Sequence, residues 1–230
     1  MGDYNQYIWV KKHCNIVKDP ILEIGSKFYI RESFIDYRSL FPNYDYICSD
    51  IEIGENVDIK LDITDSIDNI LKTLKYKKFG TIICCSVLEH VDEIFQASMN
   101  ISKLLNKGGV LFVSVPFIWE EHGYPSDYWR FTPEAIKFLF KDLKFDYSLS
   151  TISSNKTNDI KKLDFGLNNF TKPLYENTPY ATETNSFIRQ FKRGVKFLSD
   201  SKFRNQYISK LVRDGNEFKK CCINMIGIKI

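Results

Sequence analysis

The stretch DPILEIGSKFYI, Asp19 to Ile30, decides the fold class. Its apolar residues run up to Glu23 and Gly25, as they do in the first strand of a nucleotide-binding sheet. A dinucleotide-binding turn needs further glycines here, so that a diphosphate can approach the backbone, but larger residues follow instead. A carboxylate before a single glycine repels a diphosphate and favours a ligand that carries positive charge.

Short apolar runs alternate with segments of helical period through the first two thirds of the chain, a pattern typical of strands joined by crossover helices. We therefore predict an α/β fold: a Rossmann-like, doubly wound, seven-stranded and mostly parallel sheet whose last strand is antiparallel. The expected strands lie at 21–24, 46–49, 59–62, 81–85, 110–115, 144–152 and 221–230. The expected helices lie at 32–40, 66–75 and 91–105, with another beginning at Thr132-Pro133-Glu134.

Length and composition indicate one core with an insertion. A chain of 230 residues, 43% of them hydrophobic, can bury a sizeable core but is short for two full domains. We assign residues 1–152 and 221–230 to the core and 153–220 to a partly helical insertion that covers the acceptor site. The sequence has no apolar run long enough for a membrane span and no signal-peptide pattern, so we expect a cytoplasmic protein.

The six cysteines are expected to be reduced core thiols. Cys84-Cys85 and Cys221-Cys222 are adjacent pairs in apolar runs, where neighbouring side chains of a strand point to opposite faces. Structural zinc requires cysteines two to four residues apart with a matching second pair, and neither spacing occurs. The sequence therefore predicts no metal site.

Charge is spread unevenly along the chain. The segment Thr151 to Lys220 holds 14 Lys and Arg against 7 Asp and Glu, while the whole chain has a net charge of +3. Such a surplus is compatible with a phosphate-bearing or acidic small-molecule acceptor, with RNA or with an anionic surface. A solvated, lysine-rich helical face is the more common explanation of such a surplus.

Several motifs, in this order and spacing, resemble the class I S-adenosylmethionine-dependent methyltransferases, and more closely the methyltransferase-11-like branch that acts on small molecules and surface glycans. The resemblance covers roughly Pro20 to Phe140 and the last strand. It rests on ILEIGS, DYRSLFPNYDYICSDIEIGENVDIKLDIT, IICCSVLEHV, LLNKGGVLFVSVPF and HGYPSDYWRFTP. Lys27 and Tyr29 depart from the family pattern, because they replace its second and third glycines.

The resemblance implies S-adenosylmethionine as cofactor, with S-adenosylhomocysteine as product. It implies that Glu23, Gly25 and Ser26 contact the methionine end of the cofactor. Asp50 and Ile51, after the second strand, would bind the ribose. The remaining cofactor residues would be Asp62 and Ile63 beside the adenine, and Ser86, Val87 and Leu88 along the cleft after the fourth strand.

The loop EEHGYPSDYWRF follows the fifth strand and is expected to contact the acceptor. Histidine titrates near neutrality, so His122 is the candidate general base for a hydroxyl acceptor. Tyr128 is the second candidate catalytic residue. Glu121, Asp127 and Arg130 are expected to bind the substrate, together with His90 of the segment after the fourth strand. Glu89 and His90 are adjacent, and adjacent loop residues rarely face the same substrate.

These observations favour an enzyme that methylates a small polar acceptor, such as a hydroxyl of a sugar, a nucleotide-sugar or a phosphorylated metabolite in surface polysaccharide biosynthesis. Amino methylation of nucleic-acid bases is disfavoured, because the segment after the fourth strand reads CCSVLEH and lacks an N-P-P-[YF] motif. Two alternatives stay open: an RNA O-methyltransferase that uses the basic segment, and a cofactor-binding-like module that has lost catalysis and serves as a scaffold.

Overall fold

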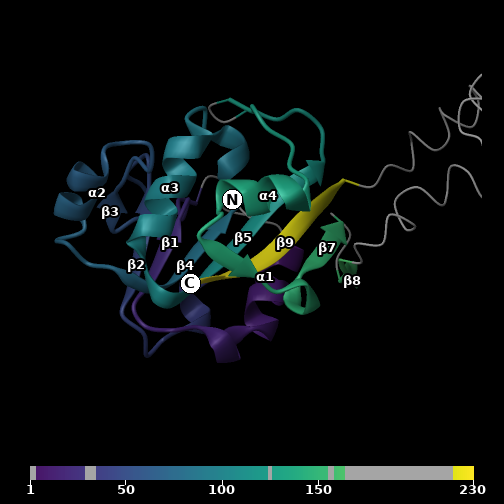
Figure 1. The fold of residues 1–230 in the computed structure, drawn as a ribbon, viewed down its shortest axis with the longest axis horizontal. Coiled ribbons are helices and arrows are strands. Elements are labelled where there is room, and N and C mark those ends of the chain that lie inside the picture. The colour runs from purple at the N-terminus through teal and green to yellow at the C-terminus, as the bar shows by residue number, and fades with distance from the viewer. Residues whose placement is uncertain (1–3, 29–34, 124–125, 155–157, 164–219) are drawn as a thin grey trace, which may run out of the picture. The chain divides into compact units, whose positions relative to one another are not determined.

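The computed structural model describes residues 4–28, 35–123, 126–154, 158–163 and 220–230 (Figure 1). In this part of the chain, nine strands form one mixed sheet in the order β3-β2-β1-β4-β5-β9-β7-β8, with β6 also paired to β9. The strands are β1 (Ile21–Ile24), β2 (Tyr46–Asp50), β3 (Ile59–Lys60), β4 (Phe79–Cys85), β5 (Leu105–Ile118), β6 (Leu143–Phe145), β7 (Thr151–Ser154), β8 (Ile160–Lys162) and β9 (Cys221–Lys229). The predicted α/β fold class is confirmed.

The first five strands are parallel to one another and create the edge at which a ligand would bind. β1 pairs with β2 on one side and with β4 on the other, so the order of strands reverses between β1 and β4. β2 continues to β3 and β4 continues to β5, all in parallel register. In open sheets of this kind the crevice at the carboxyl ends of the strands, beside the reversal, is the usual ligand site.

The remaining strands are antiparallel, and here the structure differs from the predicted single strand at 144–152. β6 and β7 pair with successive parts of the same β9, at Gly227–Lys229 and Cys221–Asn224. A 3₁₀ turn at Tyr147–Leu149 separates them. One predicted strand is therefore two short ones, and β8 adds a further strand to the edge, so the described sheet exceeds the seven strands expected.

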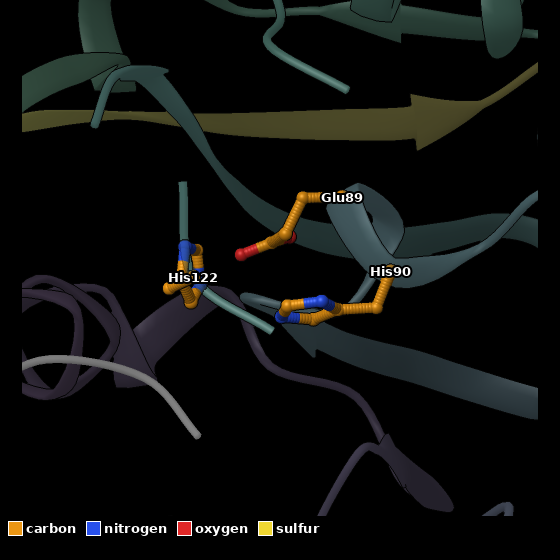
Figure 2. Close-up of side chains that lie close together, drawn as sticks. All are labelled: Glu89, His90 and His122. Atoms are coloured by element: carbon orange, nitrogen blue, oxygen red, sulfur yellow. The ribbon is translucent and has the colours of Figure 1, made fainter. Parts of the chain in front are cut away.

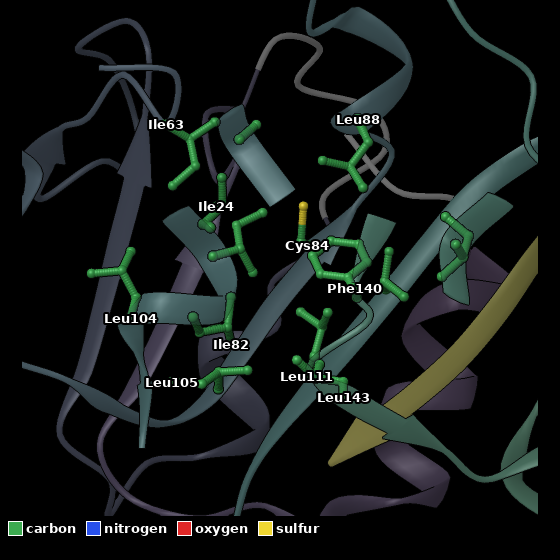
Figure 3. Close-up of a cluster of buried hydrophobic side chains, with 14 of the residues drawn as sticks. Ile24, Ile63, Ile82, Cys84, Leu88, Leu104, Leu105, Leu111, Phe140 and Leu143 are labelled. Carbon is green, nitrogen blue, oxygen red and sulfur yellow. The ribbon is translucent and has the colours of Figure 1, made fainter. Parts of the chain in front are cut away.

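Helices cover both faces of the sheet (Figure 1). The helices are α1 (Tyr4–Lys12), α2 (Ile67–Thr73), α3 (Ile94–Leu104) and α4 (Pro133–Leu139). Residues of α2, α3 and α4 pack in one core cluster, part of which is drawn in Figure 3. Trp9 and Val10 of α1 pack in a second cluster with Tyr37 and Phe41.

The two adjacent cysteines of β4 lie in different clusters. Cys84 belongs to the cluster beneath α3, and Cys85 belongs to the cluster beneath α1. All six cysteines are free thiols. The prediction of reduced core thiols on opposite faces of a strand is confirmed for this pair.

Several predicted helices are found, with shifted ends. Ser66 caps α2 and Thr132 caps α4, each by accepting a hydrogen bond from a backbone amide of the first turn. Part of the helix predicted at 32–40 lies outside the described residues. The described part, 35–40, contains only a 3₁₀ turn at Arg38–Leu40. Residues 41–45 then form a short turn into β2.

The insertion predicted at 153–220 is described only at its ends. Residues 153–154 and 160–162 belong to β7 and β8, so the core sheet extends beyond the boundary expected at 152. The helical segment predicted at 186–213 lies outside the described residues. Among the helices that are described, none has the length and apolar character needed to span a membrane.

Candidate functional site

Residues from three neighbouring strands meet at the edge where the strand order reverses. Gly25 follows β1, Asp50 ends β2 and Ser86 follows β4. Because parallel strands end at the same side of a sheet, these three positions lie along one edge. We call this edge, from Glu23 of β1 to Ser86, the rim.

Gly25 makes the turn out of β1, and only glycine fits there. Its φ is +82°, in the left-handed region, and a Cβ at this position would lie 2.2 Å from Cγ2 of Val87. The turn after β1 therefore packs directly against the segment after β4. Two predicted cofactor residues, Gly25 and Val87, are brought into contact.

The four described backbone amides after β1, those of residues 25–28, all donate to acceptors within the protein. The amides of Gly25 and Ser26 donate to the carbonyl of Ser49, at 2.9 and 3.1 Å. The amide of Lys27 donates to Oδ2 of Asp50 at 3.1 Å, and the next amide, of Phe28, donates to a carbonyl of the β2–β3 connection. A loop that cradles a diphosphate presents free amides to it, so residues 25–28 are not arranged as a phosphate site.

Asn56 holds the same loop from the other side. The side chain of Ser26 is buried and donates to the carbonyl of Asn56 at 2.8 Å, and Nδ2 of Asn56 donates back to the carbonyl of Ser26 at 3.0 Å. Ser26 thus acts in the turn itself. Asn56 carries a left-handed φ of +65°, and the sequence reasoning did not single it out.

Glu23 is a buried acid at the centre of the rim. Its side chain accepts a hydrogen bond from the hydroxyl of Tyr46 at 2.7 Å, and the thiol of Cys48 lies 3.6 Å from the same oxygen. No ion pair to Glu23 is found in the described part of the chain. Burial raises the pKa of Glu23 to about 7, because removal from water penalises its charged form.

The two predicted aspartates differ in their surroundings. Asp50 is buried, and its two oxygens accept from the amides of Lys27 and Glu52, each at 3.1 Å. These two bonds orient the carboxylate of Asp50 at the end of β2. Asp62 is exposed, and one of its oxygens accepts from both the amide and the hydroxyl of Thr64, at 2.8 and 2.6 Å. This is the geometry of a residue that stabilises its own turn.

The apolar residues among the predicted cofactor contacts also differ in their exposure to solvent. Ile51 is 52% exposed beside the rim, where it can cover a flat ring. Ile63 and Leu88 are buried in the core cluster beneath α3 (Figure 3), so their side chains support the rim from inside. Only their backbone can line the cleft.

Ser86 is held by a polar network that the sequence reasoning missed. Its φ is +53°, and its amide donates to the carbonyl of Ser114 at 2.9 Å. Nε2 of Gln6 in α1 donates to the hydroxyls of Ser86 and Ser114, at 2.9 and 2.7 Å. Ser114 in turn donates to Oδ1 of the fully buried Asn224 at 2.6 Å. The network therefore joins α1, β4, β5 and β9 beneath the rim.

Hydrogen bonds from Arg130 hold the loop after β5 together. All five of its N–H groups are donated inside the loop: to both oxygens of Asp127 at 2.5 and 2.7 Å, and to the carbonyls of Trp119, Glu120 and Trp129. This pairing holds the pKa of Asp127 well below its usual range. Arg130 and Asp127 therefore shape the loop.

The same loop is tied to the segment after β4. The amide of Tyr128 donates to the carbonyl of Glu89 at 2.8 Å, and Nε1 of Trp129 donates to the carbonyl of Val91 at 2.7 Å. The side chain of Tyr128 is 52% exposed, and Glu121 is also exposed. These two predicted residues face solvent.

Glu89, His90 and His122 converge where the two segments meet (Figure 2). One ligand atom from each lies within 4.8 Å of the others, and the two imidazole rings are 5.0 Å apart between centroids. Burial raises the pKa of Glu89 to about 7 and lowers the pKa of His90. The 3₁₀ turn at Leu88–His90 directs both neighbours toward His122, a convergence that the sequence alone did not indicate.

Solved structures of other proteins have a similar architecture. A crystal structure from Galdieria sulphuraria, described as a sarcosine dimethylglycine methyltransferase, aligns over 98% of this chain and 85% of its own, with a TM-score of 0.51 and 11% identity. The chain has the Rossmann-like methyltransferase fold. An Archaeoglobus fulgidus SAM-dependent methyltransferase aligns over 97% of this chain and 92% of its own, with a TM-score of 0.49 and 16% identity.

The N-methyltransferase NodS of Bradyrhizobium japonicum, solved with S-adenosylhomocysteine, aligns over 70% of this chain and 85% of its own, with a TM-score of 0.45 and 14% identity. No family model and no curated protein sequence matches the chain. At these identities the likeness concerns the fold, and the chemistry has to be argued from the residues of the site.

Proposed function

We propose that the protein is an S-adenosylmethionine-dependent methyltransferase acting on a small polar acceptor. The observation that carries this proposal is Glu23: a buried carboxylate, without an ion pair among the described residues, at the strand reversal of a methyltransferase fold. A ligand with an ammonium group would supply the missing positive charge. The described amides after β1, those of residues 25–28, all donate within the protein instead of being presented to a diphosphate, which disfavours a dinucleotide.

The rim offers partners for the rest of the cofactor. Asp50, a buried carboxylate at the end of β2, would accept from ribose hydroxyls, and charge-assisted hydrogen bonds of this type are strong. Ile51 offers an exposed apolar surface for the adenine. Gly25 and Val87, packed against each other, would form the floor beneath the methionine part. When bound, the cofactor supplies an electrophilic methyl group bound to a sulfonium.

The acceptor would lie under the loop after β5. We propose a hydroxyl of a sugar, nucleotide-sugar or phosphorylated metabolite, as the motif resemblance implies. Nδ1 of His122 lies 3.1 Å from Oδ2 of Asp127 and 3.2 Å from the carbonyl of Glu120, and both are acceptors. These contacts place the proton on Nδ1, so Nε2 keeps a lone pair that can remove a proton from an acceptor hydroxyl.

Lys220 links the acceptor loop to the chain that enters β9. Its Nζ lies 2.7 Å from Oε2 of Glu120 and 5.9 Å from the ring centroid of Trp119. The contact joins residue 220, at the entry to β9, to the loop after β5.

Isothermal titration with S-adenosylmethionine and S-adenosylhomocysteine tests the cofactor. Binding of both in a one-to-one ratio is expected for wild type, with strong weakening in Glu23→Gln. Glu55→Gln, which alters an exposed acid, is the matched control. A module that has lost catalysis and its cofactor would give no heat and no thermal shift with either ligand.

The acceptor is tested with methyl-labelled cofactor and a panel of sugars, nucleotide-sugars, phosphorylated metabolites and RNA. Incorporation into one of the small molecules supports the proposal. Incorporation into RNA alone would identify the RNA O-methyltransferase alternative and refute the proposed acceptor class.

A further inference from the structure

Three potential metal ligands meet between the segment after β4 and the loop after β5. Glu89 and His90 come from the 3₁₀ turn at Leu88–His90, and His122 comes from the loop. Figure 2 shows the carboxylate of Glu89 and the ring of His90 both directed toward His122. The chain has 3 histidines in all, and two of them are in this cluster.

Glu89 provides the observation that points to a cation. The side chain is 1% exposed, and its Oε2 has no hydrogen-bond partner. Leaving a buried acceptor without a partner typically costs about 1–3 kcal/mol, and more when the group is charged. No described residue forms an ion pair with Glu89. A positive ion in the gap would satisfy this oxygen.

Both histidines are held in the form that binds metals. Nδ1 of His90 lies 2.6 Å from the carbonyl of Ser126, so this nitrogen must donate. Nδ1 of His122 faces the carboxylate of Asp127 and the carbonyl of Glu120, and must also donate. Nε2 of each ring therefore keeps its lone pair. Metal-binding histidines are oriented in the same way, with the second nitrogen donating to a carbonyl or carboxylate.

We propose that Glu89, His90 and His122 bind a divalent transition-metal ion. Two imidazoles and one carboxylate suit Zn²⁺, Mn²⁺, Fe²⁺ or Co²⁺ better than Mg²⁺ or Ca²⁺, which prefer oxygen ligands. Bonds of about 2.0–2.2 Å in a tetrahedral site place ligand atoms roughly 3.4 Å apart. From separations of up to 4.8 Å, the three side chains need to close by about 1 Å or somewhat more.

This proposal revises the sequence prediction of no metal. That prediction rested on cysteine spacing, which is informative for structural zinc but not for a histidine and carboxylate site. Three protein ligands leave at least one position open, as catalytic sites do. An acceptor oxygen bound there would lose its proton more easily. This catalytic use rests on the proposed methyltransferase function, and it would replace the general-base role of His122.

Metal binding is tested on the full chain without cofactor. Chelator-treated protein is titrated with Co²⁺, followed by its visible absorption, and with Zn²⁺, followed by calorimetry. One ion per chain is expected. Glu89→Gln and His90→Gln should each weaken binding by at least 100-fold. His13→Gln is the matched control, because Nδ1 of His13 also faces a carbonyl, that of Trp9 at 2.8 Å, but lies outside the cluster.

Unchanged affinity in Glu89→Gln, or equal loss in His13→Gln, would overturn the proposal. Circular dichroism and binding of S-adenosylhomocysteine show whether each variant is folded. If one variant fails to fold, the other variant and the Co²⁺ spectrum of wild type decide, because imidazole and carboxylate ligation has its own absorption. Cofactor binding is measured separately, so failure of the metal site and failure of the methyltransferase proposal give different results.

Discussion

Replacing Glu23 by glutamine tests the central electrostatic argument. The substitution keeps the shape of the side chain and an oxygen that can accept from Tyr46, but it removes the ionisable group. Burial raises the pKa of Glu23 from 4.5 to about 7. The folded state therefore binds a proton more tightly than the unfolded chain does, and stability from this group is present below pH 4.5 and is lost as pH rises toward 7.

The magnitude follows from the size of this change in pKa. Each unit corresponds to about 1.36 kcal/mol, so ionised Glu23 costs the folded state roughly 3 kcal/mol at pH 8 and under about 1 kcal/mol at pH 5. Glu23→Gln avoids this cost. Its free energy of unfolding, relative to wild type, should therefore increase by roughly 2.5 kcal/mol between pH 5 and pH 8.

Urea denaturation of both proteins at a series of pH values measures this difference. Glu89 titrates in the same range in both proteins, so its contribution cancels. The control Glu55→Gln should run parallel to wild type. A difference between Glu23→Gln and wild type that changes by less than about 0.5 kcal/mol from pH 5 to pH 8 would refute the reasoning.

The same ionisation governs the proposed cofactor. An ammonium group binds the carboxylate form of Glu23, so binding below pH 7 has to release a proton, and affinity should fall up to about tenfold per pH unit. In Glu23→Gln this dependence should disappear. At pH 8 the affinity should be weaker by roughly 10- to 150-fold, the value of a hydrogen bond to a charged group. Calorimetry in buffers of different ionisation enthalpy also reports the proton directly.

Three further substitutions test the supports of the rim. Gly25→Ala should lower the free energy of unfolding by roughly 2–4 kcal/mol in urea denaturation, because the added Cβ clashes and the φ is unfavourable for alanine. Its control is Gly108→Ala, which has a similar φ of +72° but no close contact, and which should lower the free energy of unfolding by only about 1 kcal/mol. Asn224→Ala leaves buried hydroxyls without partners and should cost about 2–4 kcal/mol by thermal or urea unfolding. Asp127→Asn should increase protease cleavage of the loop after β5 at neutral pH, and an unchanged cleavage rate would show that the pair with Arg130 does not hold the loop.

The sequence pattern predicted the parallel half of the sheet well, because its signals are local. β1 and β4 are short, largely apolar runs that are buried along their whole length, as strands covered on both faces should be. Ser66 and Thr132 are polar residues directly before helical segments, and both are caps. The rim residues could be named for the same reason: each directly follows a recognisable strand.

Other elements could not be predicted, because their partners are distant in sequence. Half of the buried residues of α1 are the amides Asn5 and Gln6, so apolar periodicity does not reveal its inner face. Their partners, Ser154 and Ser114, lie more than 100 residues away. The break between β6 and β7 is likewise set by pairing with β9, which follows much later in the chain.

The Glu89, His90 and His122 cluster shows this limit most clearly. His122 follows β5 and the other two follow β4, and nothing in either segment alone indicates that they meet. The two segments lie together because β4 and β5 are parallel neighbours, and because the amide of Tyr128 bonds to the carbonyl of Glu89. A sequence reading that examines one motif at a time will separate such ligands.

Glu23 and Glu89 together bear on whether the protein is a retired scaffold. Both are buried acids with a pKa of about 7, and neither has an ion pair among the described residues. The free energy of unfolding of a domain of this kind is typically about 5–15 kcal/mol, so two such acids lower it considerably at neutral pH. A ligand that binds only the folded state recovers stability in proportion to its concentration. Two cationic ligands, an ammonium-bearing cofactor at Glu23 and a metal ion at Glu89, would account for both acids, whereas a scaffold without ligands accounts for neither.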